Sequence, residues 1–427
     1  MIVSAMSQPD TKPYPDTLEI NAARLLGRIE SFAKIGQGPG GGITREGFSD
    51  ADLDARAALI GEARACGLEA DVDAAGNILI RRAATGPDPA HRKVLMMGSH
   101  LDTVVNAGRL DGVYGVLAAL EVLQVLAESG TDLPCEPVAV AFANEEGALF
   151  PQPFWGSMAL AGRLEELPAQ PCDHDGHSLR APLARAGGNL DELESAVWPT
   201  GSVAAYLELH IEQGPVLERA GRQIGVVDAI TGRAVLTVQV TGASGHAGTT
   251  PMDHRRDAMV AAARMVTAVE HASKEDGLCR VATVGRLETQ PNSPNSIAGT
   301  ARLTIDLRDT DPGRLERVEA TVRDAIRVIA EQTGTRVDYL ATTRSTPVAT
   351  AQELRAAITR SAEELGLTHR TLPSGAGHDA QMVADIAPIG MIFVPSIGGV
   401  SHVPEEDTSP ADLVSGAQVL LRTVLRV

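Results

Sequence analysis

Four short apolar runs, most of them containing β-branched residues, constrain the fold of this chain more than any other feature. They are Val94–Met97, Val138–Ala143, Ala204–Leu209 and Ile389–Val394, and each has the length and composition of a buried strand. Each run is followed by polar, ionisable residues, in the segments SHLD, NEE, HIEQ and, slightly later, SH. Because ligands bind beyond the carboxyl ends of strands in open α/β sheets, the pattern predicts a sheet edge that collects His, Asp and Glu.

The elements around these runs predict an α/β protein with two domains. Helical spacing of apolar residues predicts helices at Thr17–Ile35 and Asp50–Cys66. From about Gly225 to about Arg344 the pattern changes to strand Ala234–Val240, helix Asp257–His271, strands Val281–Leu287 and Thr300–Leu307, helix Asp311–Gln332 and a short strand Val337–Ala341. This order resembles a small ferredoxin-like α+β sandwich that interrupts a larger α/β domain. We therefore expect one domain at residues 1–226 plus 344–427 and an inserted domain at 227–343.

The composition of the chain argues against some classes of binding partner and favours one cellular location. A net charge of −18 argues against nucleic acid, which requires clustered Lys and Arg. No run approaches the roughly 18 apolar residues of a membrane span, and the first residues, MIVSAMSQPDTKPYPD, lack the basic and apolar regions of a signal peptide. The four cysteines, Cys66, Cys135, Cys172 and Cys279, form no C-x-x-C pair. Reduced thiols and a cytoplasmic location are therefore expected.

The segment GSHLDTVVNAGRLDGVYGVLAALE contains His100, Asp102 and Asp111 in a turn-rich loop that opens into a helix. The neutral imidazole of His100 is a candidate metal ligand. Asp102 can fix the tautomer of His100 by contacting this ligand without binding the metal itself. Asp111 offers two oxygens, enough to bridge two cations about 3.5–4 Å apart. The H-x-D pattern alone is equally compatible with a solvated loop and a helix cap at Asp111.

Three further segments place ionisable or amide side chains at predicted strand ends. AFANEEGALF holds Glu145 and Glu146, and a metal would let one glutamate ligate while its neighbour takes a proton from water. YLELHIEQGPVLE holds His210 and Gln213, and FVPSIGGVSHVPEE presents His402 on a glycine-rich loop. Taken singly, the glutamates fit a solvated surface pair and His210 fits a buried core histidine. Together the segments predict a site for two divalent ions with an open position for water.

The motifs resemble those of a known family. The hydantoinase/carbamoylase branch of the M20 metallopeptidases has segments similar to GSHLDTV…DG…GV, EEG, ELHIEQGPVLE, GASGHAGTTPMDHRRDA, PNSPNSI…IDLRD, SGAGHDA and MIFVPS…G-SH-P-E. The branch includes N-carbamoyl-L-amino acid hydrolase, allantoate amidohydrolase and β-ureidopropionase. The resemblance runs from about Asn21 to the C-terminus.

The resemblance implies a two-metal centre. His100 and His210 would hold one ion, Glu146 and His402 the other, and Asp111 would bridge both. Glu145 would be the general base, and Asp102 would support His100. Zinc is the expected metal, with manganese, cobalt and nickel as alternatives that suit the same donors.

The resemblance also implies substrate-binding residues and a role for the inserted domain. His246 in GHAGTTPM would reach across from a partner subunit and stabilise the developing oxyanion, although on bare sequence it fits a turn histidine. Asn295 and Arg308 match the pair that grips the substrate carboxylate, for which Arg offers a planar fork. Gln213 would meet the ureido or amide end, and the loop with His378 would close the pocket. The inserted domain would be a lid that also forms a homodimer.

The predicted reaction is hydrolysis of the carbamoyl C–N bond of N-carbamoyl-L-amino acids to amino acid, ammonia and carbon dioxide. The expected partner is thus a small ureido substrate that bears a carboxylate. Allantoate amidohydrolase, then β-ureidopropionase, a dipeptidase-like activity and an N-acyl amidase are alternatives, and a non-catalytic ureide-binding protein is a rival from another class. Two departures from the family border the expected pocket: EEGALF lacks an arginine before the phenylalanine, and VVNAGRLDG lacks a proline and a double glycine.

Overall fold

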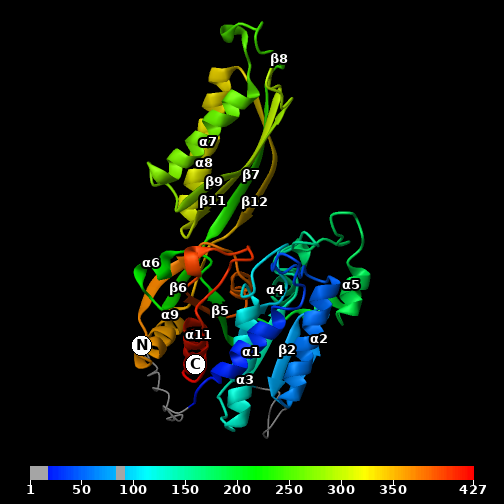
Figure 1. Cartoon of the computed structure of the whole chain (residues 1–427), viewed down its shortest axis with the longest axis vertical. Coiled ribbons are helices and arrows are strands. Elements are labelled where there is room, and N and C mark those ends of the chain that lie inside the picture. Colours follow the sequence, from blue (N-terminus) through cyan, green and yellow to red (C-terminus); the bar gives the residue numbers. More distant parts are fainter. Residues whose placement is uncertain (1–17, 83–91) are drawn as a thin grey trace, which may run out of the picture. The chain divides into compact units, whose positions relative to one another are not determined.

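A computed structural model describes residues 18–82 and 92–427 of the protein. The described chain separates into two compact units with separate cores (Figure 1). The first contains the chain up to Val227 together with Thr350–Leu372 and His378–Val427, and the second contains Asp228–Ala349 and Pro373–Gly377. The insertion therefore ends beyond the predicted residue 343. The N-terminal stretch 1–16, in which no signal peptide is expected, lies outside the described residues.

The first unit is built on a large mixed sheet that contains all four predicted strands. Its strands, in spatial order, are β1 (Leu68–Val72), β2 (Ile78–Arg82), β4 (Glu136–Phe142), β3 (Val94–His100), β5 (Val203–Ile211), β15 (Ile389–Val394) and β6 (Ile224–Ile230). The central strands β4, β3, β5 and β15 run parallel to their neighbours in this group. Their carboxyl ends therefore meet at one edge, and the prediction of a shared edge is confirmed.

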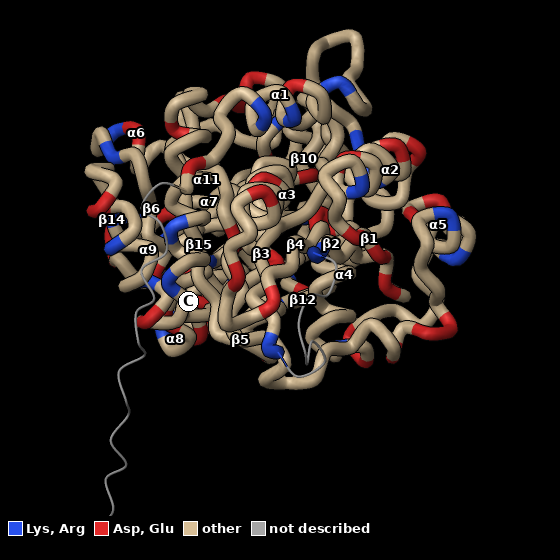
Figure 2. The backbone as a smooth tube through the Cα atoms, turned by 90° about the horizontal axis from the view of Figure 1, so that it is seen from below, with Lys and Arg blue, Asp and Glu red and all other residues tan. Residues whose placement is uncertain are grey.

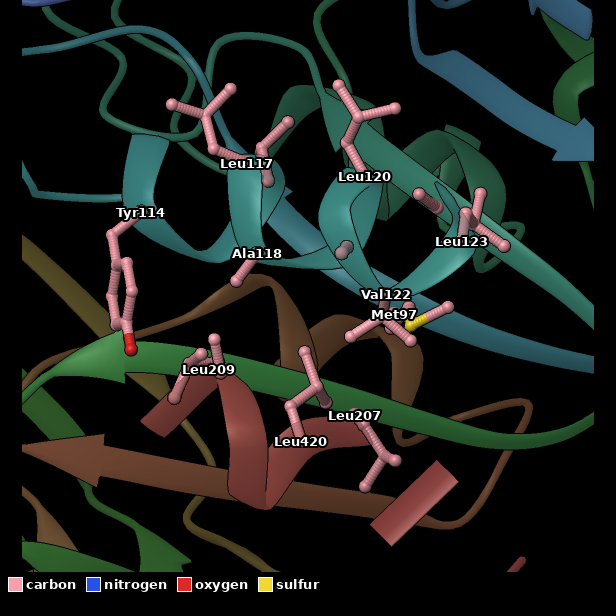
Figure 3. Packing of buried hydrophobic residues seen from close by; sticks show 14 of the residues in the cluster. Met97, Tyr114, Leu117, Ala118, Leu120, Val122, Leu123, Leu207, Leu209 and Leu420 are labelled. Atoms are coloured by element: carbon pink, nitrogen blue, oxygen red, sulfur yellow. The ribbon is translucent and has the colours of Figure 1, made fainter. Parts of the chain in front are cut away.

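Helix α3 (Val113–Glu128) forms the centre of the first unit. Nearly all of its residues are buried, and its apolar side chains pack near Leu207 and Leu209 of β5 and Leu420 of α11 (Pro410–Val424) (Figure 3). Buried Glu121 accepts hydrogen bonds from Arg24 and Arg28 of α1 (Ala22–Phe32), which fastens α1 to α3. The loop that carries Asp111 thus leads into a helix held by packing on several sides.

Helix α1 is shorter than predicted. It begins at Ala22 because the side chain of Asn21 accepts a hydrogen bond from the backbone N–H of Arg24 and caps the helix. Thr17, the predicted start, lies outside the described residues. Helix α2 (Asp50–Ala65) agrees with its prediction to within a residue and is capped by Ser49 in the same way.

The second unit is a four-stranded antiparallel sheet with two helices. Its elements are β7 (Gly232–Thr241), α7 (Ala258–Lys274), β9 (Val281–Gln290), β11 (Thr300–Asp309), α8 (Pro312–Thr333) and β12 (Arg336–Ser345), with the sheet order β12-β7-β11-β9. The predicted element order is confirmed. Alternate residues of β7 and β11 are buried, and they share one core with α7 and α8. A small ribbon of β8 (Gly245–His246) and β10 (Ser296–Ile297) completes the unit.

Several elements were not predicted from the sequence. Besides β1, β2, β6, β8, β10 and α11, they include α4 (Trp155–Leu160), α5 (Arg180–Arg185), α6 (Val216–Ala220), β13 (Val348–Ala349), α9 (Gln352–Glu364), β14 (His369–Ser374) and α10 (Asp379–Val383). Among the described residues, no helix has both the length and the apolar character needed to cross a bilayer. Lys and Arg are scattered among Asp and Glu along the tube in Figure 2.

Gly98, in the middle of β3, allows β3 and β4 to pair closely. It pairs with Val140 and has a φ of 153°, and a Cβ atom at this position would lie 1.9 Å from the Val140 carbonyl oxygen. We expect Gly98→Ala to lower the free energy of unfolding by about 3 kcal/mol or more, at the upper end of overpacking effects. Denaturant unfolding measures this change.

Gly61→Ala is the matched control. Gly61 is exposed in the interior of α2, and a Cβ atom there would meet nothing within 4 Å. This variant should gain about 0.5–1 kcal/mol from helix propensity. Equal stability of the two variants would contradict the close approach at Gly98.

Candidate metal centre

The sheet edge brings the first group of predicted ligands together. His100 is the last residue of β3, His210 lies in the neighbouring strand β5, and Asp111 lies on the loop before α3. Nε2 of His210 lies 3.1 Å from Oδ1 of Asp111, and Nε2 of His100 lies 3.7 Å from the same oxygen. All three side chains are buried, and their donor atoms lie within 4.8 Å of one another.

A second group meets the other oxygen of Asp111. Nε2 of His402 lies 3.0 Å from Oδ2 of Asp111 and 3.4 Å from Oε1 of Glu146. Glu146 follows β4, and His402 lies on the loop after β15. The side chain of His402 is 47 % exposed, so this side of the site is open to solvent. The two oxygens of Asp111 thus face two different groups of donors, as a bridging carboxylate requires.

The charges in the site favour a cation. Burial and the neighbouring carboxylates raise the pKa of Glu146 to about 8 and that of Glu145 well above its usual range. Burial opposes ionisation of Asp111 too, but His210 and His402 outweigh it and hold the pKa of Asp111 well below its usual value. Contact with Asp111 in turn raises the pKa of both histidines to about 9, in His210 against the effect of burial. These pKa shifts show that the crowded site favours positive charge beside its carboxylates.

The donor set fits divalent cations. It consists of imidazole nitrogens and carboxylate oxygens at the end of a rigid sheet, a combination that suits zinc, manganese, cobalt and nickel. A cation would neutralise the crowded carboxylates, of which Glu146 otherwise holds a proton at neutral pH. The clusters of donor atoms are therefore compatible with the use of divalent metal.

Asp102 makes different contacts from those predicted. Nδ1 of His100 faces the backbone carbonyl of Asp102 at 2.9 Å, whereas the Asp102 carboxylate lies 3.9 Å away. That carboxylate instead accepts hydrogen bonds from the backbone N–H groups of Glu145 and Glu146, at 3.1 and 3.0 Å. The carbonyl of Asp102 can therefore fix the tautomer of His100, while its side chain holds the glutamate pair in place. Oε2 of Glu145 lies 3.7 Å from Nε2 of His100, inside the site.

Gln213 and His378 also lie in the first unit beside this site. The amide nitrogen of Gln213 donates to Oδ2 of Asp111 at 2.9 Å, so the predicted amide-binding group is next to the bridging carboxylate. His378 is buried, and its ring lies against that of His210 with the centroids 4.7 Å apart. Burial lowers the pKa of His378 well below its usual range. His378 therefore lies beneath the surface, next to the proposed ligand His210. Its role in closing a pocket remains a prediction.

Two buried acids next to His210 were missed by the sequence analysis. Glu208 accepts hydrogen bonds from the hydroxyl of Ser99 and the backbone N–H of Ala380. It also forms a third cluster with His210 and His378. Asp379 is fully buried near Glu208, and burial raises its pKa well above the usual range. Both acids lie within the family-like motifs ELHIEQ and GHDA, and this position could have identified them as candidates.

His246, Asn295 and Arg308 lie in the second unit. His246 pairs with Ser296 in the β8–β10 ribbon, and the N–H of Ala247 donates to the carbonyl of Asn295. Both side chains are exposed. Arg308 lies at the opposite end of β11 from this ribbon, about 25 Å away at the usual rise of a strand. One chain therefore does not bring Asn295 and Arg308 together as a pair on one carboxylate.

The guanidinium of Arg308 is already oriented within the second unit. Its Nε and Nη2 donate to the two oxygens of Asp306, at 3.1 and 3.0 Å, and Nη1 donates to the Gly375 carbonyl at 2.6 Å. Asp306 also accepts from Arg233. Each Nη atom has two hydrogens, so one on each remains to meet another anion.

Comparisons with known proteins place this architecture in a family. Residues 96–426 match the description of peptidase family M20/M25/M40. The chain is 39 % identical over 407 residues to the N-carbamoyl-L-amino acid amidohydrolase of Geobacillus stearothermophilus, covering 95 % of this chain and 98 % of the relative. It is 38 % identical over 391 residues to the allantoate amidohydrolase of Escherichia coli (strain K12), covering 91 % and 94 %.

A solved structure agrees with the sequence relatives. The crystal structure of an amidase of the hydantoinase/carbamoylase family from Burkholderia multivorans is similar with a TM-score of 0.86 and 35 % identity. The similarity covers 96 % of this chain and 98 % of that one. The resemblance and the mixed α/β fold, with its large sheet whose central strands are parallel, are thereby confirmed.

We expect metal binding to release protons. Glu146 holds a proton below about pH 8, and His210 and His402 hold theirs below about pH 9. A ligating cation must displace these protons, so the apparent affinity for Zn²⁺ or Mn²⁺ should rise from about pH 6 to about pH 9. Calorimetric titration in buffers of different ionisation enthalpy counts the protons released. Glu146→Gln should release fewer of them, and an affinity that does not change with pH would contradict the expectation.

Proposed function

Because the chain belongs to peptidase family M20/M25/M40, we propose that it is a metal-dependent amidohydrolase acting on the carbamoyl C–N bond of N-carbamoyl-L-amino acids. Addition of water would break the bond between the carbamoyl carbon and the amino-acid nitrogen. The products would be the free amino acid and carbamate, which decomposes to ammonia and carbon dioxide. Allantoate is the second candidate substrate, because an allantoate amidohydrolase is almost equally similar.

The position of Asp111 is the observation that carries the proposal. Its Oδ1 faces His100 and His210, and its Oδ2 faces His402 and Glu146. Such a carboxylate supports two divalent ions, with zinc as the expected metal. When bound, the ions would polarise the scissile carbonyl and lower the pKa of water.

Glu145 is the proposed general base. It is buried beside the ligands, and its raised pKa favours both accepting and returning a proton. It would take a proton from water and later deliver it to the departing amine. Asp102 holds the backbone of Glu145 and Glu146 through two hydrogen bonds, so base and ligand keep a fixed relation to each other.

Arg308 is the proposed anchor for the substrate carboxylate. Asp306 accepts from one edge of its guanidinium, and one hydrogen remains on each Nη atom to meet a substrate carboxylate. The carboxylate of Asp306 remains ionised at neutral pH. Burial opposes its ionisation, but Arg308 and Arg233 outweigh burial and lower the pKa of Asp306. An anionic substrate is thus met by a pre-oriented cation in a chain whose net charge is −18.

We further propose that the second unit is a ferredoxin-like lid that forms a homodimer. His246 and Asn295 lie at one end of β11 and Arg308 at the other, too far apart for one small ureido acid. If all three act on the substrate, they must come from two chains. His246 would then serve the site of the partner subunit as an oxyanion donor, with Asn295 beside it.

A substrate panel tests the proposed activity. It compares N-carbamoyl-L-amino acids, β-ureidopropionate, allantoate, dipeptides and N-acyl amino acids, with protein loaded with Zn²⁺, Mn²⁺, Co²⁺ or Ni²⁺. We expect the highest kcat/KM for an N-carbamoyl-L-amino acid. A preference for allantoate would support the second candidate, and loaded protein that hydrolyses none of the panel would support a ureide-binding protein instead.

Glu145→Gln separates catalysis from metal binding. We expect kcat to fall by about 100- to 10,000-fold, because the amide cannot accept the proton of water. Metal content should stay that of the unaltered protein. Glu146→Gln is the matched comparison, since it should lose metal as well as activity. Near-normal turnover of Glu145→Gln would remove Glu145 from its role.

Mixing two inactive variants tests the proposal that each site uses two chains. Glu145→Gln keeps His246 but lacks the base, and His246→Ala keeps the base. Co-expressed together, they should recover about a quarter of the unaltered activity, because half of the dimers are mixed and each has one complete site. Activity of the mixture no higher than that of the separate variants would place both residues in the same site of one chain.

A further inference from the structure

Glu406 is a buried acid that links two loops of the metal centre. It is only 2 % exposed. Its Oε1 accepts hydrogen bonds from the backbone N–H groups of Leu110 and Asp111, at 2.9 and 3.1 Å. Its Oε2 accepts from the hydroxyl of Ser401 at 2.6 Å and from the N–H of His402 at 3.4 Å. Both oxygens therefore accept hydrogen bonds from the backbone of the proposed ligands Asp111 and His402, or from the residues next to them.

These ligands come from distant parts of the chain. Asp111 precedes α3, and His402 follows β15. The loops also approach at Gly108, where a Cβ atom would lie 2.3 Å from that of Glu406. Beside them, Arg109 donates to Asp407 at 2.8 Å, which is a second link between the same loops. Arg109 lies in VVNAGRLDG, the segment that departs from the family pattern.

His402 needs such support. Its φ is 60°, in the left-handed region that non-glycine residues rarely adopt, and its side chain is half exposed. A backbone in this conformation persists only where its surroundings hold it. Glu406 contacts the N–H of His402 directly and reaches the side of Asp111 through Ser401, whose hydroxyl lies 3.4 Å from Oδ2 of Asp111.

We propose that Glu406 is a positioning residue that sets the second cation position by holding Asp111 and His402 in one arrangement. The proposal rests on the two-ion centre of the proposed function. Asp102 and Glu406 are both buried carboxylates that accept from backbone N–H groups. The N–H groups that Asp102 meets belong to the adjacent residues Glu145 and Glu146, whereas those that Glu406 meets lie on two separate loops. The His100–His210 side receives no contact from Glu406 among the described hydrogen bonds, so the two cation positions should respond differently to its removal.

Stepwise binding of Zn²⁺ to the full-length, metal-free protein tests the proposal. We expect the unaltered protein to bind two equivalents. In Glu406→Ala the second equivalent should bind about 10- to 100-fold more weakly, the usual effect of removing a partner of a ligand, and the first should change much less. In Glu406→Gln, the amide oxygen can still accept from Leu110 and Asp111, so the second equivalent should recover part of its affinity.

Glu405→Gln is the matched control. Glu405 is the exposed neighbour on the same loop, so this variant removes the same charge and should leave both affinities unchanged. The absorption spectrum of the Co²⁺-loaded protein gives an independent readout, because it depends on the coordination of the ions. Glu406→Ala should change only the part of the spectrum that appears with the second equivalent.

The outcomes separate this proposal from the proposed function. Equal weakening of both equivalents in Glu406→Ala, or no weakening of the second, would overturn the positioning role while leaving the two-ion centre intact. An unaltered protein that binds only one equivalent would overturn the centre itself, and the positioning role with it. Recovery in Glu406→Gln together with an unchanged Glu405→Gln supports the role.

Discussion

The contact between Asp111 and its flanking imidazoles is the interaction on which the rest of the site depends. Its two oxygens lie 3.1 Å from His210 and 3.0 Å from His402. The contact brings together the buried carboxylate of Asp111, His210 of strand β5 and His402 of the loop that follows β15. The neighbouring acids Glu145 and Glu146 would otherwise repel it, and burial together with this repulsion raises the pKa of both. Positive charge at this place, whether from protons or cations, is what allows so many acids to be buried together.

The sequence was sufficient to predict the sheet edge and to name side chains that the fold brings close together there. The positions of strand residues such as His100 and His210 follow from the apolar runs that predict buried strands. Parallel strands then bring their carboxyl ends to one edge of the sheet. The inserted unit could be predicted for the same reason, since β7 and β11 alternate clearly between buried and less buried positions. In these segments local pattern and tertiary environment agree.

The remaining features depend on geometry that no local pattern encodes. Whether His100 meets the carbonyl or the carboxylate of Asp102 depends on the course of a loop, and the sequence is the same in either case. Glu406 is one of two adjacent glutamates, and only the fold shows which of them is buried. Asn295 and Arg308 share a motif string, yet the length of an intervening strand separates them.

The place of β15 in the sheet has a consequence for the order in which the chain assembles. β15 lies between β5 and β6, both of which precede it in the sequence by well over a hundred residues. During synthesis from the N-terminus, β5 and β6 therefore cannot complete the central sheet until residues 389–394 arrive to separate them. The inserted unit, whose strands and helices pair among themselves, faces no such delay. Completion of the first unit, and the approach of His402 to Asp111, must wait for almost the last part of the polypeptide to leave the ribosome.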